Sequence, residues 1–488
     1  MMKKTGVLIQ ALTVLLICAS LSCSGGGGDT LASGGIGGTG VTSSGEVTGF
    51  GSIWVNGIEF DTRHAEIFIN NTSQGSGDQV VLENLDIGRL VSVKGRTYDT
   101  VSGTADQVYY VSSVAGPIEA IDIIDAYTTQ LTVLGQAVIV DDRTRLKGAA
   151  IDDFAVGNLV DASGLIDASG HIIVSFLEKT ADAALPGAVY YVSGPVSGIG
   201  ADNLSINNLT VDTSGAEISG VSPSDIETGT FVSISGSLDN DHPGVFIADT
   251  LQPYRLLGDL QDGDPVEFTG YVFDQPAANQ FHINGYAAEV SSETQLIGGA
   301  LTDILQGTKI KVEGYFSDGV IVVQQLTFSA AMKAESHLVQ KDDAALTLEL
   351  TGLESLTIRT NSLTRFIGLE HSFASLSVGD HLVVRGHIVG DQTAVAHQVI
   401  ALPAAPGLDR IEIQGTVTSI GQPLIAINGV QIDTDMIPSG GFSAYNGVAI
   451  SREDFFAAAG ENDTVEASGD LLADDSVAWQ SISLVQSQ

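Results

Sequence analysis

The sequence predicts an all-β protein, a tandem array of about six small β-barrel domains that follows a signal peptide and a glycine-rich tether. Three observations predict this fold class. A strand bounded by two glycines seven residues apart recurs along the chain. Asn-Gly pairs separate runs rich in β-branched residues, as two-residue hairpins require. The closing glycines lie 69, 72, 78, 72 and 83 residues apart, a spacing that suits small closed domains better than the turns of a solenoid.

The N-terminal residues are typical of an export signal. Lys3 and Lys4 precede an apolar run at 7–18. This run is too short to span a bilayer, because a spanning helix needs about 20 apolar residues. Residues 1–22 are therefore predicted to be a signal peptide. Residues 23–44 are predicted to be a lipid-anchor cysteine followed by a Gly/Ser-rich linker, since residues 24–44 include nine glycines.

Cys23 is the predicted site of lipid attachment. Ser22 precedes it, as in lipoprotein signals, although Ser20 stands where such signals usually have Leu. Cleavage without lipidation is the alternative, but a long tether directly after a cysteine favours an anchored domain. Ser24 resembles the outer-membrane sorting pattern. We therefore expect an exported protein that is lipid-anchored in the outer membrane, with its periplasmic or cell-surface orientation left open.

Charge and cysteine content exclude several classes of function. The chain has 20 Lys+Arg against 59 Asp+Glu, a net charge of −39, and removal of Lys3 and Lys4 with the leader gives 18 − 59 = −41. Affinity for phosphate backbones comes from Lys and Arg, so no nucleic-acid partner is expected. Loss of Cys18 leaves Cys23 alone, which excludes disulfides and thiolate chemistry in the exported chain.

One β-strand defines the repeat. Apolar residues at its third and fifth positions alternate with mostly polar residues at the fourth and sixth, so one face lies in a core and the other in water. The bounding residues are expected at positive φ or in tight bends. They are Gly88 and Gly95, Gly157 and Gly164, Gly229 and Gly236, Gly307 and Gly314, Gly379 and Gly386, and Asn462 and Gly469.

A hairpin and a short connector precede this strand. Asn56-Gly57, Asn284-Gly285 and Asn428-Gly429 predict type I′ turns, and Leu134-Gly135 and Asn207-Asn208 take their place in the second and third repeats. The connectors leave room for one helical turn. The predicted domains are β repeats at 45–114, 115–182, 190–254, 263–328, 335–402 and 410–488.

Two alternatives bear on this organisation. Gly263 to Gly270 match the strand pattern again, either as the first strand of the fourth repeat or as a degenerate extra copy. Five or six strands in about 70 residues suggest an OB-like barrel. A tandem immunoglobulin-like sandwich would need about 100 residues and a core Trp in each unit. Only Trp54 and Trp479 are present, so small barrels are favoured, each expected to unfold on its own.

The first repeat adds a more specific resemblance. The leader, the glycine-rich run at 34–40 and the segment at 49–62 (GFGSIWVNGIEFDT) resemble a bacterial family of exported lipoproteins built of tandem repeats of a domain of unknown function. The other repeats match through the weaker strand pattern. The resemblance implies OB-like barrels and an envelope location. It implies no catalytic or binding residues.

The sequence favours a protein that is not an enzyme. Residues 35–40 match G-x-G-x-x-G but lack the preceding strand and following helix of a dinucleotide site. The sequence has no P-loop, no G-x-S-x-G and no H-E-x-x-H. We therefore predict no catalytic residues and no cofactor beyond the lipid at Cys23, with bound Ca²⁺ as an option.

Two groups of residues are candidates for metal binding. Five of the nine histidines fall in the fifth repeat, and His381 and His387 lie six residues apart on one predicted strand. Surface histidines without metal are the alternative. Asp239 and Asp241 lie in an acidic loop whose oxygens could gather Ca²⁺, although the loop lacks EF-hand spacing. A solvated loop is the alternative there.

These observations favour a non-enzymatic cell-envelope lipoprotein, a multi-domain β-barrel scaffold or interaction protein. Its predicted partners are the membrane, through the lipid anchor, and an unidentified protein or polysaccharide. One alternative is a surface module that binds polysaccharide or protein and is stabilised by Ca²⁺. Another is a hydrolase of envelope glycans, which would use a pair of carboxylates.

Overall fold

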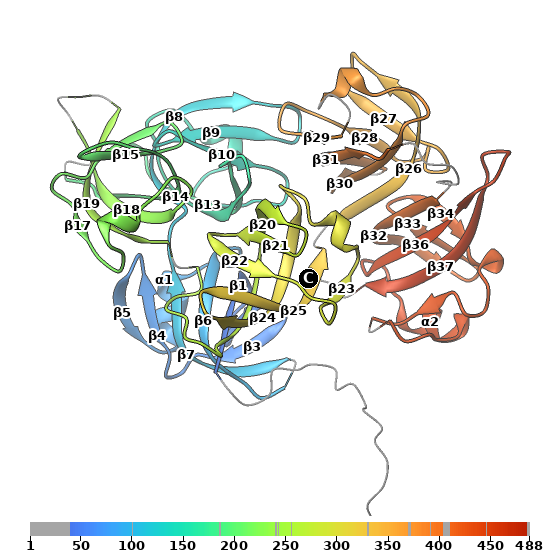
Figure 1. The fold of residues 1–488 in the computed structure, drawn as a ribbon, viewed down its shortest axis with the longest axis horizontal. Helices are drawn as coiled ribbons and strands as arrows, with labels where there is room; N and C mark the ends of the chain where they lie inside the picture. Colours follow the sequence, from blue (N-terminus) through green and yellow to red (C-terminus); the bar gives the residue numbers. More distant parts are fainter. Residues whose placement is uncertain are drawn as a thin grey trace, which may run out of the picture. The chain divides into compact units, whose positions relative to one another are not determined.

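The computed structural model describes residues 40–485, except 100, 185–186, 240–241, 243, 255, 329–330, 369–371, 391, 404–409 and 446. The predicted signal peptide, Cys23 and most of the tether lie outside the described residues. The described chain consists mainly of strands in three sheets (Figure 1). Within it, no helix combines the length and the apolar character needed to cross a membrane.

Five strands of each of the first five repeats follow one topology. The first strand pairs with the first strand of a hairpin, and the second hairpin strand runs parallel to the last strand. The last strand pairs with the Gly-bounded strand, which returns to the first. This order closes an OB-like barrel. In the sixth repeat, β34 pairs only with β33 among the described residues, so the ring stays open there. All-β tandem small barrels are thus confirmed.

The elements of the first three barrels come in this order. Barrel 1 holds β1 (Gly40–Gly49), β2 (Ile53–Val55), β3 (Ile58–Asp61), β4 (Glu66–Ile69), β5 (Thr72–Ser76), α1 (Asp78–Asn84), β6 (Leu90–Thr97) and β7 (Ser102–Tyr110). Barrel 2 holds β8 (Val114–Ile123), β9 (Thr129–Val133), β10 (Gln136–Val140), β11 (Arg145–Lys147), β12 (Leu159–Ile166) and β13 (Ile172–Ala181). Barrel 3 holds β14 (Tyr190–Ile199), β15 (Asn203–Ile206), β16 (Leu209–Asp212), β17 (Glu217–Ile218), β18 (Phe231–Leu238) and β19 (Val245–Pro253).

The last three barrels repeat that order. Barrel 4 holds β20 (Pro265–Ala277), β21 (Gln280–Ile283), β22 (Tyr286–Glu289), β23 (Gln295–Ile297), β24 (Lys309–Ser317) and β25 (Val320–Phe328). Barrel 5 holds β26 (Met332–Asp342), β27 (Thr347–Leu350), β28 (Thr357–Arg359), β29 (Arg365–Ile367), β30 (His381–Gly390) and β31 (Thr393–Ala401). Barrel 6 holds β32 (Arg410–Gly421), β33 (Leu424–Ile427), β34 (Val430–Asp433), β35 (Phe442–Ser443), α2 (Arg452–Ala458), β36 (Thr464–Leu471) and β37 (Val477–Val485). Most of the segment from Gly263 to Gly270 therefore lies in β20, the first strand of barrel 4.

The two residues that bound the Gly-bounded strand have different roles. The opening glycines have φ between 87° and 96°, and Asn462 has φ of 73°, a region that favours Gly and tolerates Asn. The closing glycines do not have positive φ, so the expectation of positive φ is wrong for them. Each sits at a bulge against the last strand, where a Cβ would lie 2.0–2.5 Å from a backbone oxygen.

Neighbouring barrels are joined through their first strands. β8 pairs antiparallel with β14, β26 pairs antiparallel with β32, and β1 pairs parallel with β20. Barrels 2 and 3 accordingly share one hydrophobic core, and so do barrels 5 and 6. Barrel 1 has a core of its own, and the core of barrel 4 also takes in Leu90 of barrel 1 and Leu165 of barrel 2. Shared sheets and cores link the barrels more closely than a flexible string of domains would.

The first three barrels and the last three make matching contacts. The pairing of β8 with β14 has the same register, relative to the repeat, as that of β26 with β32. Arg145 of barrel 2 lies against Gly88 of barrel 1, and Arg365 of barrel 5 lies against Gly307 of barrel 4. The described chain thus contains two similar three-barrel halves, which meet at β1 and β20.

A buried charge network lies between barrels 5 and 6. Lys333 Nζ is 2.5 Å from Glu412 Oε1, and both side chains are buried. Burial and the neighbouring Glu412 carboxylate raise the pKa of Glu466 to about 7. A carboxyl whose pKa is higher in the folded chain contributes stability at low pH, and this contribution is lost as pH rises through the folded pKa.

Glu466→Gln is therefore expected to raise the unfolding free energy at pH 8 and to change it little at pH 5. The expected gain at pH 8 is on the order of 1–3 kcal/mol, since the carboxylate would be charged and half-buried beside the Glu412 carboxylate at that pH, whereas the amide is neutral. Urea unfolding at the two pH values measures it. Glu293→Gln, at an exposed carboxyl, is the control. An equal effect at both pH values would contradict the assigned titration.

Candidate functional site

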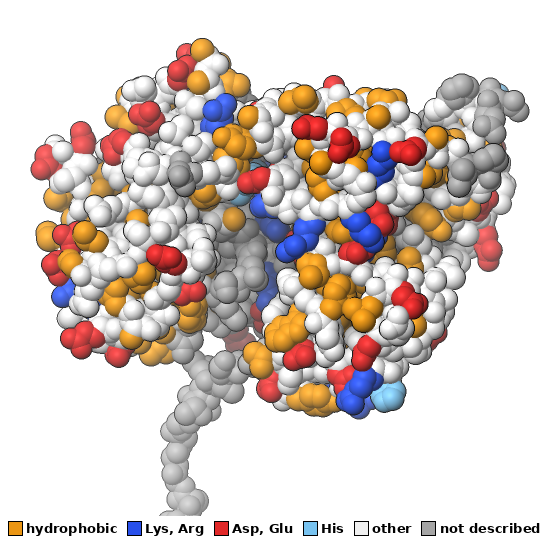
Figure 2. Space-filling model, turned by 180° about the vertical axis from the view of Figure 1, so that it is seen from behind, with side chains coloured by type: hydrophobic (Ala, Val, Ile, Leu, Met, Phe, Trp, Pro, Cys, Tyr) orange, Lys and Arg blue, Asp and Glu red, His pale blue; other side chains and the backbone are white. Residues whose placement is uncertain are grey.

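Barrels 1, 2, 4 and 5 border a cavity of about 250 Å³. Its walls come from β1 and β6, from the segment after β10 together with β12 and β13, from β20 and the start of β24, and from β30 and β31. Figure 2 shows Lys and Arg side chains gathered along a hollow on one face of the molecule. The cavity lining itself includes three cationic side chains, those of Arg143, Lys309 and Arg385.

Arg385 is the most unusual of these cations. Its exposed fraction is 5%, yet none of its three guanidinium nitrogens has a hydrogen-bond partner among the described residues. Asp303 Oδ2 lies 3.4 Å from Nη2 as an ion pair, and the Phe328 ring centroid lies 5.9 Å from the guanidinium carbon. A buried guanidinium usually satisfies its donors, so unpaired donors on a side chain that lines a cavity indicate a place for an acceptor.

Arg143 is held by a local turn. β10 ends at Val140, and the Asp141 carboxylate then accepts the backbone N–H of Arg143 at 3.0 Å. The other oxygen of Asp141 lies 2.5 Å from Arg143 Nη2 and 3.1 Å from Nε. Burial opposes ionisation of Asp141, but the guanidinium outweighs it and keeps the pKa of this carboxyl below its usual value.

Two histidines of barrel 5 lie beside this pair. His387 Nδ1 and His397 Nε2 are 2.8 Å apart, and His387 Nε2 is 3.2 Å from Asp142 Oδ1 of barrel 2. Burial and the charge of Arg143 lower the pKa of both His387 and His397. Both imidazoles are therefore neutral at pH 7. Their mutual hydrogen bond lies within barrel 5, and His387 brings this pair against Asp142 of barrel 2.

Asp141, His387 and His397 form the one group of described residues whose possible metal-ligand atoms all lie within 4.8 Å of one another. Imidazole and carboxylate suit zinc and related ions. However, Arg143 engages both oxygens of Asp141 and adds a positive charge. A metal bound by Asp141 would share this carboxylate with the guanidinium and meet its positive charge, so the present geometry fits the group poorly as a metal site.

The metal-binding residues predicted from the sequence lie apart. His381 Nε2 is 3.1 Å from Glu335 Oε1, and its ring packs against His337. The strand pairing shifts between Arg385 and Gly386, so His381 and His387 have different neighbours. Asp239 Oδ2 lies 2.8 Å from His242 Nδ1. Asp241 lies outside the described residues.

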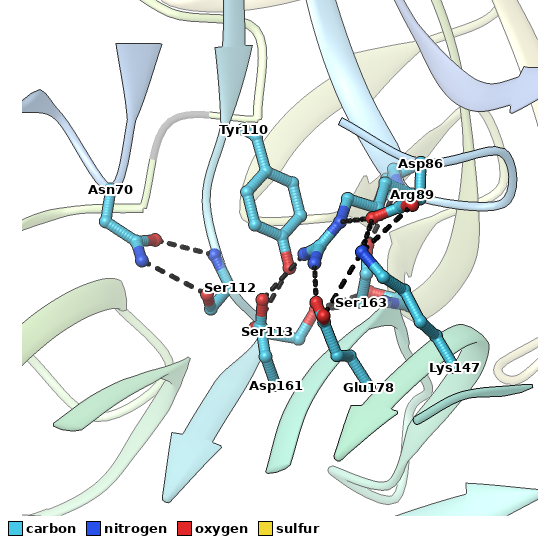
Figure 3. Close-up of polar contacts among 12 residues, drawn as sticks. Asn70, Asp86, Arg89, Tyr110, Ser112, Ser113, Lys147, Asp161, Ser163 and Glu178 are labelled. Carbon is cyan, nitrogen blue, oxygen red and sulfur yellow. Dashed lines mark hydrogen bonds and ion pairs between the residues drawn. The ribbon is translucent and has the colours of Figure 1, made fainter. Parts of the chain in front are cut away.

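A second charged cluster holds barrels 1 and 2 together next to the cavity (Figure 3). Arg89 lies 2.6 Å from Asp161 Oδ2 and 2.5 Å from Glu178 Oε2. Its guanidinium lies over the rings of Tyr110 and Phe176, 4.6 and 4.5 Å from their centroids. The next residue, Leu90, lines the cavity and donates its N–H to Ser163 Oγ.

Sequence reasoning missed Arg89, Arg143, Lys309 and Arg385. Each contacts residues of another repeat or a cavity shared between repeats, and a pattern within one repeat carries no such information. The concentration of histidines in the fifth repeat was a usable signal, because it includes both His387 and His397.

Comparison with protein families gives four matches to one model, described as a domain of unknown function (DUF5666), at residues 115–173, 193–249, 269–325 and 342–400. These segments fall in barrels 2 to 5. A solved structure titled drosophila Unr CSD456 is similar at 10% identity and a TM-score of 0.16, covering 46% of this chain and 98% of that chain. No match to a curated protein was found. Barrels 2 to 5 therefore match a domain of unknown function (DUF5666) four times in tandem, and the chain is a tandem-repeat protein.

Proposed function

We propose that this chain is a non-enzymatic, membrane-anchored binding protein of the cell envelope, whose barrels jointly form one binding site. The site is the cavity bordered by barrels 1, 2, 4 and 5. One observation carries the proposal: Arg385 is buried at this cavity without a hydrogen bond. Burying an unsatisfied charged group costs free energy, which a ligand with acceptor atoms would recover.

The joined barrels support a preformed site. The Arg89 cluster fixes barrel 1 against barrel 2, and β1–β20 pairing fixes barrel 1 against barrel 4. Asn361 donates a hydrogen bond to Asp125 Oδ2 at 2.7 Å and connects barrel 5 to barrel 2, and His387 Nε2 lies 3.2 Å from Asp142 Oδ1 of barrel 2. Binding to a preformed site costs less ordering of the protein than binding to separate, freely moving domains.

The proposed test fills the cavity. Ala331 lines it and is exposed, so Ala331→Trp should occupy space without disturbing a core. A library of small anionic, cationic and neutral molecules and oligosaccharides is screened by thermal unfolding. We expect at least one compound to raise the unfolding temperature of the wild type and to lose this effect in Ala331→Trp.

The matched control is Ala345→Trp, at an exposed residue in the turn after β26 that does not line the cavity. It should respond to the compound like the wild type. If no compound stabilises the wild type, or if Ala331→Trp responds equally, the cavity is not a binding site and the proposal fails.

The export signal and tether support the location in this proposal. Lipidation at Cys23 would hold the barrels at the outer membrane, with residues 24–44 as a flexible spacer. Cys23→Ser is expected to move the protein from the membrane fraction to the soluble fraction of fractionated cells. Retention of the variant in the membrane would show that Cys23 is not the anchor.

A further inference from the structure

We infer that the ligand of this cavity carries an oxyanion, a carboxylate, sulfate or phosphate group, bound by Arg385, Lys309 and Arg143. The inference rests on the proposed binding function and adds the chemical class of the ligand. It depends on the charges that line the cavity, on the unused donors of Arg385 and Lys309, and on the size of the space.

The charge balance of the lining favours an anion. Three cations, Arg143, Lys309 and Arg385, line the cavity with two carboxylates, Glu46 and Asp141, and a third carboxylate, Asp303, pairs with Arg385 from outside the lining. The chain as a whole carries −39, so a cavity with more cations than anions is unlike its surface. The two neighbouring histidines, whose pKa values are lowered, are neutral and add no negative charge. A cationic ligand would meet three positive side chains at short range.

The donors are available for the ligand. No hydrogen bond or ion pair joins Lys309 Nζ to another described residue, and burial lowers the pKa of Lys309 despite the nearby Glu46. Arg385 has three nitrogens without hydrogen bonds. A guanidinium presents paired N–H groups that match two oxygens of a carboxylate, sulfate or phosphate. An oxyanion between Arg385 and Lys309 would satisfy both.

The space fits a small ligand. The cavity of about 250 Å³ lies next to a second of about 80 Å³, and both are lined by Arg143, Tyr271 and His397. Pockets for drug-sized ligands usually measure about 300–1,000 Å³. The buried face of Tyr271, with 8% exposed, offers apolar contact beside the charges. A small organic acid or a phosphate or sulfate ester therefore fits better than a polymer.

Isothermal titration calorimetry of the full purified protein tests the inference. Sodium phosphate, sodium sulfate and sodium succinate are titrated at low ionic strength, with sodium chloride as the reference anion. We expect at least one oxyanion to bind and chloride not to compete at equal concentration. The three titrants separate phosphate, sulfate and carboxylate as the preferred group.

Two variants assign the binding to the cavity. Arg385→Met and Lys309→Met are each expected to weaken binding by roughly 10- to 100-fold, the effect of losing a hydrogen bond to a charged group. Arg96→Met removes the same charge from a side chain that is 66% exposed and outside the cavity, and should bind like the wild type. If Arg385→Met fails to fold, the affinity of Lys309→Met alone decides whether the oxyanion binds in the cavity.

Two results would overturn the inference. One is that none of the three oxyanions binds the wild type. The other is equal weakening in Arg96→Met and in the cavity variants, which would show only general electrostatic attraction. If a neutral or cationic compound stabilises the wild type but not Ala331→Trp, while no oxyanion binds, the proposed binding function stands and the oxyanion assignment fails.

Discussion

Arg89→Met should lower the free energy of unfolding by about 3–5 kcal/mol, the usual effect of removing one partner from a buried ion pair. The Arg89 side chain is 5% exposed, and its partners Asp161 and Glu178 are 16% and 22% exposed. Methionine keeps an apolar stem against Tyr110 and Phe176 but leaves the two carboxylates without their main counter-charge. Lys147, 3.2 Å from Glu178, compensates only in part.

Urea unfolding followed by circular dichroism measures this loss. Arg96→Met, with an exposed side chain 4.0 Å from Asp106, is the control and should change stability by less than about 0.5 kcal/mol. Adding Asp161→Asn to Arg89→Met should restore part of the loss, since it removes one of the uncompensated charges. A loss below about 1 kcal/mol in Arg89→Met would mean that the cluster does not hold the barrels together.

The second large effect is expected at the closing glycines. Gly95→Ala adds a single carbon, which would lie 2.1 Å from Thr104 O and 3.0 Å from Ala105 Cα. Both neighbours are backbone atoms of the paired strand, so relief requires movement of β6 against β7. We expect destabilisation of about 1–3 kcal/mol from this overpacking, and more in Gly95→Val.

Gly215→Ala provides the matched control. Gly215 is exposed, has no positive φ, and nothing lies within 4 Å of the added carbon, so the substitution should be neutral or slightly stabilising. Thermal unfolding compares the two variants. Equal unfolding temperatures would show that β6 and β7 separate easily, contrary to the role assigned to the closing glycine.

Much of each barrel was predictable from local patterns. The Asn-Gly pairs have positive φ at both positions, for example 53° at Asn56 and 80° at Gly57, because only the primed turns match the twist of a hairpin. The alternation of apolar residues placed Val91 and Val93 in the core. Tyr110 is also buried, with 2% exposed. Such features depend on neighbours within a few residues or on the next strand.

The assembly of barrels and the cavity were not predictable in this way. Asp141 and His387 are 246 residues apart in sequence but belong to one cluster, and Arg89 meets carboxylates of the next repeat. The repeat pattern predicts each barrel but does not predict which faces of the barrels contact one another. The expectation that each barrel unfolds alone took no account of these contacts. With cores shared by barrels 2 and 3 and by barrels 5 and 6, we expect coupled unfolding.

The two three-barrel halves pair through β1 and β20, so this pairing does not depend on the concentration of the protein. A half with the same strands on its own would present an uncovered strand edge, which invites pairing with another molecule. Because both halves belong to one chain, the pairing of their strand edges is intramolecular. Its effective concentration is in the millimolar range for a short connection. The edge of β1 is then covered even when a cell makes only a few copies.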